Sequence, residues 1–295
     1  MDMQEFCRKL PKVELHAHLN GSLSVSTLQK LCKMHRSGIA SDQACMDTTN
    51  FSSLSECFKM FDIAHALTIT PQAVFVATCD VIKEFHEDNV IYLELRSTPR
   101  AVNDLMTKTE YLEAIIKAME ASKSEFPQIL VKLLVSINRK QGYESAEENI
   151  NLAIQFIEKY PGYVVGIDLS GDPTAGDSFL ELLENLQGSQ QLFNMLLESK
   201  IPVELCLTSN IKCKTVPSYM YHQFKYLYKA GHPITIGTDD KGVFNTCLSK
   251  ELKILNSVFN IGRKQLKELS ILSVQYSFAS TEEKKSLTAI IENFD

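Results

Sequence analysis

The sequence predicts an α/β fold, and three observations favour a TIM-type (β/α) barrel over a doubly wound sheet. Short β-branched and aliphatic segments alternate with longer segments of helical periodicity along most of the 295 residues. These apolar segments are nearly continuous, as parallel strands buried on both faces are. Polar residues follow almost every segment, and in a barrel the carboxyl ends of all strands form one rim, on which active sites are built.

Six strands are predicted, each short, rich in Val, Ile or Leu, and bounded by polar residues. They cover residues 13–18, 89–97, 129–137, 163–171, 201–209 and 232–240. A complete barrel of this type has eight strands. We therefore expect an incomplete barrel with about six.

Helices are predicted between the strands, because apolar residues recur there at three- and four-residue spacing. They cover residues 25–35, 54–65, 71–87, 110–124, 146–160 and 218–230, and more helices follow the last strand. The stretch 178–200 is expected to form two helices with a break near Gly188. Because no linker or internal repeat divides the chain, residues 1–295 are expected to form a single domain.

Composition restricts the class of protein. A net charge of −6 spread along the chain argues against nucleic-acid binding, which needs a basic face. No apolar run approaches the roughly 18 residues of a membrane span, and the start MDMQEFCRKLPK is too polar for a signal peptide. The eight cysteines include no C-x-x-C pair, and we expect them to be reduced thiols. A monomeric cytoplasmic protein with a small-molecule ligand is expected.

Two motifs at strand ends predict a metal site. In "VELHAHLNGS", His16 and His18 lie two residues apart on a strand and therefore face the same side. In a closed barrel the last strand lies beside the first, so Asp239 of "GTDDKG" is a plausible third ligand. Imidazole and carboxylate ligands together suit zinc or a similar divalent ion. Neither motif decides alone, because isolated histidine pairs are more often structural and T-D-D is commonly a turn or helix cap.

Five motifs together resemble the adenosine deaminase family. They are HAHLNGS, YLELRSTPR, GIDLSGDP, LCLTSN and TDDKGVF, in the family's order and over nearly the whole chain. They are most similar to its adenosine deaminase-like branch, which deaminates N6-methyl-AMP to IMP. The resemblance implies a zinc-dependent barrel with one Zn²⁺ per chain, bound by His16, His18 and Asp239.

The same resemblance implies a set of substrate contacts. They are His18, Asn20, His65, Ser97, Thr98, Pro99, Arg100, Asn138, Gly171 and Asp240. The hydroxyls of Ser97 and Thr98 and the planar donors of Arg100 suit a 5′-phosphate, although S-T-P could also simply turn the chain. Asn138 stands where the branch typically has Asp; it can still accept a hydrogen bond from a ribose hydroxyl, but without a charge. Gly171 would offer its backbone N–H to the purine.

Two motifs of the family are absent between Gly171 and Ile201. One is a histidine followed closely by glutamate, which supplies a fourth zinc ligand and the general acid/base. The other is a His-Gly pair that helps to position the attacking water. None of the seven histidines falls between His86 and His222. About two βα units are therefore expected to be absent near residues 187–189, as in a shortened splice form or an imperfect gene model.

No other residue is expected to substitute for the missing pair. His232 begins the last strand, roughly 20 Å from Asp239 at about 3.3 Å per residue, and His222 belongs to the preceding helix. Glu204 is inside a strand, about two residue pairs below the rim. The remaining acidic candidates lie on helix faces expected to point outward; they are Glu181, Glu184 and Glu198.

Three functions are compatible with these observations. The first is zinc-dependent hydrolytic deamination of a purine nucleotide, N6-methyl-AMP to IMP and methylamine, as the resemblance implies. The second is a catalytically inactive shortened isoform that retains at most nucleotide or metal binding. The third is an adenosine deaminase acting on the nucleoside. Another zinc or iron hydrolase of the wider amidohydrolase class is disfavoured by the purine-type GDP and TDD motifs.

Overall fold

The computed structural model describes residues 1–35, 54–171 and 189–294. These residues form a parallel α/β fold. Its six strands are β1 (Lys12–His18), β2 (Val90–Ser97), β3 (Leu130–Asn138), β4 (Val164–Ser170), β5 (Val203–Leu205) and β6 (Ile234–Ile236).

The strands form one parallel sheet in the order β1-β2-β3-β4 and a second in the order β5-β6. A parallel bridge between Ala17 and Asp239 joins the two sheets. At this bridge the N–H of His18 donates to the carbonyl of Asp239, and the N–H of Asp239 donates to the carbonyl of His16, both at 2.8 Å. No pairing joins β4 to β5 within the described ranges, so the barrel is open there. The prediction of a barrel-type fold with about six strands is confirmed.

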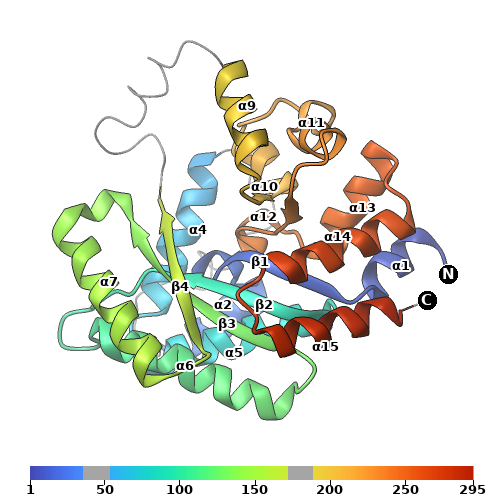
Figure 1. The fold of residues 1–295 in the computed structure, drawn as a ribbon. Coiled ribbons are helices and arrows are strands. Elements are labelled where there is room, and N and C mark those ends of the chain that lie inside the picture. The colour runs from blue at the N-terminus through green and yellow to red at the C-terminus, as the bar shows by residue number, and fades with distance from the viewer. Residues whose placement is uncertain (36–53, 172–188, 295) are drawn as a thin grey trace.

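The helices surround this sheet, with α5, α6 and α7 on its outer face and α13 and α14 beside β1 and β6 (Figure 1). The N-terminal helices are α1 (Met3–Lys9), α2 (Val25–Met34), α4 (Leu54–Leu67) and α5 (Pro71–Glu87). The central helices are α6 (Lys108–Glu125), α7 (Gly142–Lys159), α9 (Ser189–Ser199), α10 (Leu207–Lys212) and α11 (Phe224–Lys229). The C-terminal helices are α12 (Lys241–Phe244), α13 (Leu248–Phe259), α14 (Arg263–Tyr276) and α15 (Thr281–Glu292). Short 3₁₀ turns cover Asn20–Ser22, Arg139–Gln141 and Tyr219–Tyr221.

Local sequence explains where the long helices begin. Helix α5 starts at Pro71, whose fixed φ suits the first helical position, and the Thr70 hydroxyl accepts a hydrogen bond from the N–H of Ala73. Helix α6 starts with a capping box, in which Thr107 and Glu110 each bond the other's backbone N–H. These caps satisfy donors that a helix start leaves without partners.

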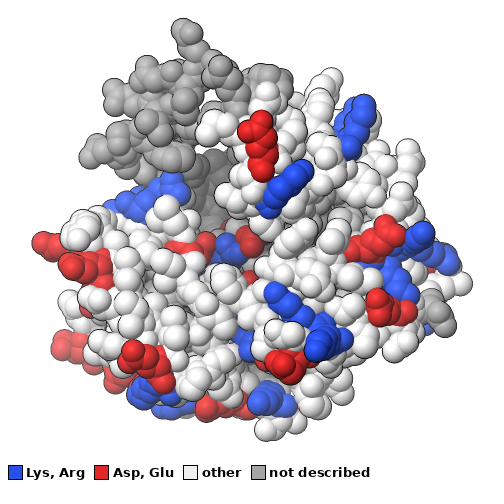
Figure 2. Space-filling model, in the orientation of Figure 1, with Lys and Arg blue, Asp and Glu red and all other residues white. Residues whose placement is uncertain are grey.

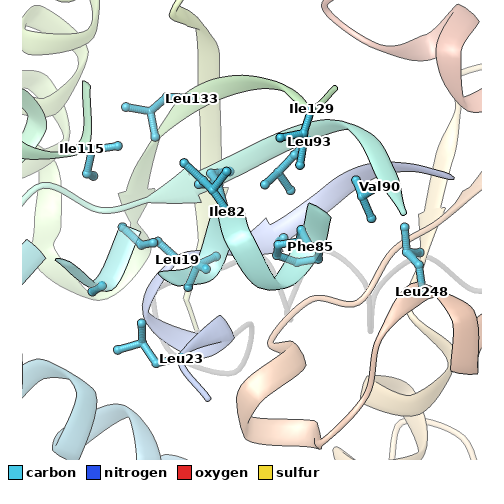
Figure 3. Packing of buried hydrophobic residues seen from close by; sticks show 14 of the residues in the cluster. Leu19, Leu23, Ile82, Phe85, Val90, Leu93, Ile115, Ile129, Leu133 and Leu248 are labelled. Carbon is cyan, nitrogen blue, oxygen red and sulfur yellow. The ribbon is translucent and has the colours of Figure 1, made fainter. Parts of the chain in front are cut away.

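Side chains alternate between two different environments along the strands. Leu93 and Leu133 point outward and pack with Ile82, Phe85 and Ile115 in a buried hydrophobic cluster (Figure 3). Residues at the intervening positions point inward, and many of them are polar. The barrel therefore has an apolar layer beneath its helices and a polar interior that opens at the carboxyl ends of the strands.

Two of the predicted strands and one predicted helix are shorter than expected. β5 and β6 contain three residues each. β5 ends because the chain turns into α10 after Cys206, where Glu251 accepts bonds from the N–H and hydroxyl of Thr208. The helix predicted over 218–230 is divided at His222, whose buried ring accepts a hydrogen bond from the N–H of Phe224. In the stretch 178–200, α9 is the second predicted helix, and the first lies outside the described residues.

The expectation that every cysteine is reduced is wrong for Cys32, which is disulfide-bonded. Cys7, Cys79, Cys206 and Cys247 are free thiols. The compartment stays a prediction. Over the described ranges, no helix is both long enough and apolar enough to cross a membrane. Acidic and basic side chains are interspersed over the face shown in Figure 2.

Candidate functional site

The two histidines at the end of β1 and the aspartate after β6 converge on one point. One ligand atom from each of His16, His18 and Asp239 lies within 4.8 Å of the others. The Nε2 atoms of His16 and His18 are each 3.5 Å from Oδ1 of Asp239. The backbone bridge between β1 and the segment after β6 holds the three residues together, as the sequence predicted for neighbouring first and last strands.

A buried polar network lies beneath this cluster, and it includes a residue that the sequence reasoning discounted. Oε2 of Glu204 is 2.6 Å from Nδ1 of His16 and also accepts from the guanidinium of Arg96. Arg96 in turn donates to Asp168 at 3.0 Å. Glu204, expected inside a strand below the rim, contacts His16 directly, and the sequence did not reveal this contact. Strand alternation identifies its inward direction, but only the folded structure shows that the two side chains meet.

The other strand-end motif, LCLTSN, supports the cluster from the opposite side. The hydroxyl of Ser209 donates to Oδ2 of Asp239 at 2.7 Å. Asn210 is held by Nε2 of the buried His222 at 2.7 Å. His232 is remote from the cluster and bonds the carbonyl of Ile201 instead. These contacts explain the polar end of the motif without any direct role in binding.

The electrostatics of the cluster favour a charged Asp239 carboxylate and a neutral His18 ring, whereas the pKa of His16 is raised to about 10, because its hydrogen bonds to Asp239 and Glu204 outweigh the effect of burial. Burial alone would raise the pKa of Asp239, but the hydrogen bond from His16 and the nearby imidazoles lower it overall. Burial lowers the pKa of the His18 side chain, which favours the neutral ring that a metal ion requires. Burial and the charge of Asp239 raise the pKa of Asp240 well above its usual value.

The residues of the cluster suit a divalent metal ion. Two imidazole nitrogens and one carboxylate oxygen are the ligands that catalytic zinc sites use. Hydrogen bonds to Glu204 and Ser209 orient two of the three, as partners of metal ligands usually do. No further His, Cys, Asp or Glu joins this group in the part of the chain that the structure describes.

A cavity of about 590 Å³ opens above the cluster. It brings together most of the residues that the sequence assigned to the site. Those that line it are His18, Asn20, His65, Ser97, Thr98, Arg100, Asn138, Gly171, Asp239 and Asp240. His16 is not among the lining residues, and Pro99 is buried away from the cavity.

Tyr111 of α6 is a supporting residue that the sequence did not reveal. Its hydroxyl lies 2.7 Å from the hydroxyl of Ser97 and accepts from Nδ2 of Asn20 at 3.2 Å. The ring is fully buried. Tyr111 thus fixes two of the lining side chains, and its contribution could not be read from a helix that otherwise shows ordinary apolar spacing.

Arg100 is partly engaged by the protein itself. One amino group donates to the carbonyls of His65 and Thr68 and to the Thr68 hydroxyl. Its buried Nε has no protein partner. The guanidinium is therefore held in place at the cavity wall while part of its hydrogen-bonding capacity is unused.

Two glycines leave room for the site. A Cβ on Gly21 would lie 1.6 Å from Oδ1 of Asp240, which has no hydrogen-bond partner in the protein. Gly171 has a φ of +100°, which favours glycine, and a Cβ there would lie 2.6 Å from Oδ1 of Asn138. Gly21 of HAHLNGS and Gly171 of GIDLSGDP are thus required by close packing at the cavity.

The comparisons with known proteins agree on one family. The family model described as adenosine deaminase matches residues 11–186 and 176–294. The N6-methyl-AMP deaminase of Bos taurus is 42% identical and covers 96% of this chain and 93% of its own length. That match extends over 328 residues, 33 more than the 295 of this chain, so the relative has positions with no counterpart here.

Solved structures agree with the fold. The crystal structure of the Arabidopsis N6-mAMP deaminase is 33% identical, with a TM-score of 0.88, and covers 98% of this chain and 100% of its own. The Arabidopsis protein ADAL complexed with IMP is 32% identical, with a TM-score of 0.86, and covers 98% of each chain. The family match, the identity to these relatives and the shared barrel lead to one conclusion: this chain belongs to the adenosine deaminase family.

Proposed function

We propose that this chain binds a purine 5′-monophosphate at a zinc centre and that its reaction is the hydrolytic removal of the C6 amine, from N6-methyl-AMP in particular. The observation that carries the proposal is the convergence of His16, His18 and Asp239 at the base of the 590 Å³ cavity. The names of the bovine and Arabidopsis relatives and the IMP complex support this substrate class.

His16, His18 and Asp239 would hold the ion, one per chain. When bound, zinc supplies a nucleophile at neutral pH by lowering the pKa of water. Asp240 lines the cavity, and its buried Oδ1 has no hydrogen-bond partner in the protein. Its carboxyl group can therefore orient a purine ring through a hydrogen bond with the ring nitrogen atoms.

The other end of the cavity would hold the ribose and the phosphate. Thr98 and Arg100 provide a hydroxyl and a cation, the donors that suit a phosphate group. The hydroxyl of Ser97 is shared with Tyr111. Oδ1 of Asn138 already accepts from the N–H of Lys140 at 3.0 Å, and its second lone pair can still accept from a ribose hydroxyl. A phosphate contact of this kind favours the nucleotide over the nucleoside.

The missing histidine–glutamate motif determines the expected rate. Loss of a general acid/base lowers catalytic rates by roughly 10²–10⁴-fold, and loss of a metal ligand weakens binding of the ion as well. We propose that the chain lacks an internal segment near residues 187–189; the 328-residue match to a 295-residue chain supports this. The same observation favours a second candidate function, namely nucleotide and metal binding without turnover.

Metal analysis combined with a product assay tests the proposal. Purified protein is expected to contain zinc in stoichiometric amount, and to release methylamine and IMP from N6-methyl-AMP faster than Asp239→Asn does. If the purified protein binds zinc and IMP but turns over N6-methyl-AMP no faster than Asp239→Asn does, the second candidate function is established. Protein that takes up neither zinc nor IMP contradicts both, and equal rates on adenosine and its nucleotide contradict the nucleotide preference.

Restoring the absent segment tests the internal gap directly. The corresponding segment of the bovine relative is inserted between Gln187 and Gly188, and an insert of equal length whose histidine and glutamate are replaced by alanine serves as the control. We expect the first insert to raise turnover of N6-methyl-AMP by about 10² or more. Equal turnover with both inserts would show that the gap is not the cause of low activity.

A further inference from the structure

The contact between Glu204 and His16 links β5 to the metal cluster. Oε2 of Glu204 lies 2.6 Å from Nδ1 of His16, while Nε2 of the same ring is 3.5 Å from Oδ1 of Asp239. A histidine that binds a metal through one nitrogen donates a hydrogen bond from the other, which fixes the ring orientation. The ring of His16 thus has the two contacts that such a ligand needs, with Nε2 directed at the cluster.

Glu204 is itself held rigidly. Arg96 donates to the same carboxylate oxygen, and its guanidinium is fixed by Asp168 at 3.0 Å and by the carbonyl of Leu15 at 2.6 Å. The side chain of Arg96 is 8% exposed. Because Arg96 keeps Asp168 as a second partner, removal of the Glu204 charge does not leave a buried cation without a counter-ion.

We infer that Glu204 is a positioning residue of the metal site, which orients His16 and strengthens its bond to the ion. This inference rests on the proposed function, since it presumes that His16 binds a metal. A cluster with only three ligands among the described residues depends more on the orientation of each one than a complete site does. The alternative is that Glu204 only balances the charge of Arg96 and has no effect on the ion.

Zinc affinity separates the two readings. The dissociation constant for zinc is measured by competition with a chromophoric chelator for the unchanged protein, Glu204→Gln and Glu94→Gln. Glu94 is the matched control because it is also a carboxyl on an inward-facing strand position, but it accepts from Tyr92 and the N–H of Phe278 rather than from a histidine. We expect Glu204→Gln to bind zinc about 10–100-fold more weakly and Glu94→Gln to bind as the unchanged protein does.

A spectroscopic measurement distinguishes a change at the metal from a general loss of structure. With cobalt(II) in place of zinc, the visible absorption bands report the ligand geometry, and we expect them to shift in Glu204→Gln alone. If Glu204→Gln does not fold, Glu204→Asp keeps the charge but shortens the reach, and the same weakening and band shift are expected.

The outcomes are distinct. If the Glu204 variants have a zinc dissociation constant within about threefold of that of the unchanged protein and unshifted cobalt bands, the inference is overturned. The proposed function then stays intact. If the protein without substitutions takes up no zinc, both the proposed function and this inference are overturned.

Discussion

Gly237 is the position at which a single methyl group should most directly disturb the metal cluster. A Cβ built there would lie 2.8 Å from Cβ of His16, 3.0 Å from Oε1 of Glu14 and 3.3 Å from Sγ of Cys206. Ordinary contacts begin at 3.4 Å, so Gly237→Ala must move His16 by at least 0.6 Å if the strands stay in place. The side chains of Glu14 and Cys206 limit relaxation of the methyl group away from His16.

This displacement exceeds the roughly 0.5 Å within which a binding constellation must be held. We therefore expect Gly237→Ala to weaken zinc binding by about tenfold or more and to lower the free energy of unfolding by about 1–3 kcal/mol, the usual range for overpacking. Chelator competition measures the first quantity, and urea denaturation of the metal-free protein measures the second.

Gly166→Ala is the control because it makes the same substitution on another strand, β4, away from the cluster. Its Cβ would meet only the ring of Phe278, at 3.4 Å, and that side chain is 53% exposed and can turn aside. Zinc affinity and stability are expected to stay close to those of the unchanged protein. If Gly237→Ala bound zinc as tightly as Gly166→Ala, the close packing of His16 against β6 would not determine the site.

Three further predictions concern pH, the supporting hydroxyl and the phosphate. Burial raises the pKa of Glu94 to about 7 from 4.5, so between these values the unfolded chain binds fewer protons and stability falls with rising pH. Relative to Glu94→Gln, the free energy of unfolding of the unchanged protein should fall by at most about 1.4 kcal/mol per pH unit over this window, as measured by urea denaturation. If the two proteins showed the same dependence of this free energy on pH, the raised pKa of Glu94 would be contradicted. Tyr111→Phe removes the hydroxyl shared by Ser97 and Asn20 and should weaken IMP binding by about 1 kcal/mol in calorimetric titration. Unchanged IMP affinity in that variant would exclude this supporting role. Arg100→Met should weaken binding of AMP by about 1.5–3 kcal/mol while the affinity for adenosine changes little. An equal loss for both ligands would mean that Arg100 shapes the cavity rather than binding phosphate.

The candidate site was largely predictable because its chemistry is local in the sequence. Strand alternation places His16 and His18 on one face, and the adjacency of first and last strands in a barrel brings Asp239 to them. Both expectations depend only on backbone geometry that every parallel barrel shares. The structure places these three side chains at one point accordingly.

The residues that support the site were not predictable, because each acts across a large sequence separation. Glu204 meets His16 from 188 positions away, and Tyr111 meets Asn20 from 91. Neither belongs to a pattern that distinguishes it from an ordinary strand or helix residue. A count of residues along β5 places Glu204 below the rim but does not show which side chain it meets across the barrel.

By itself the sequence determined the order of strands and helices, the faces on which reactive side chains lie and the motifs of the family, because these depend on local periodicity. The tertiary structure alone decided which side chains share a hydrogen bond, how Arg96 and Glu204 lie beneath the cluster and which strands pair among the described residues. Those features depend on the tilt and spacing of strands that are distant in sequence, and no local pattern records them.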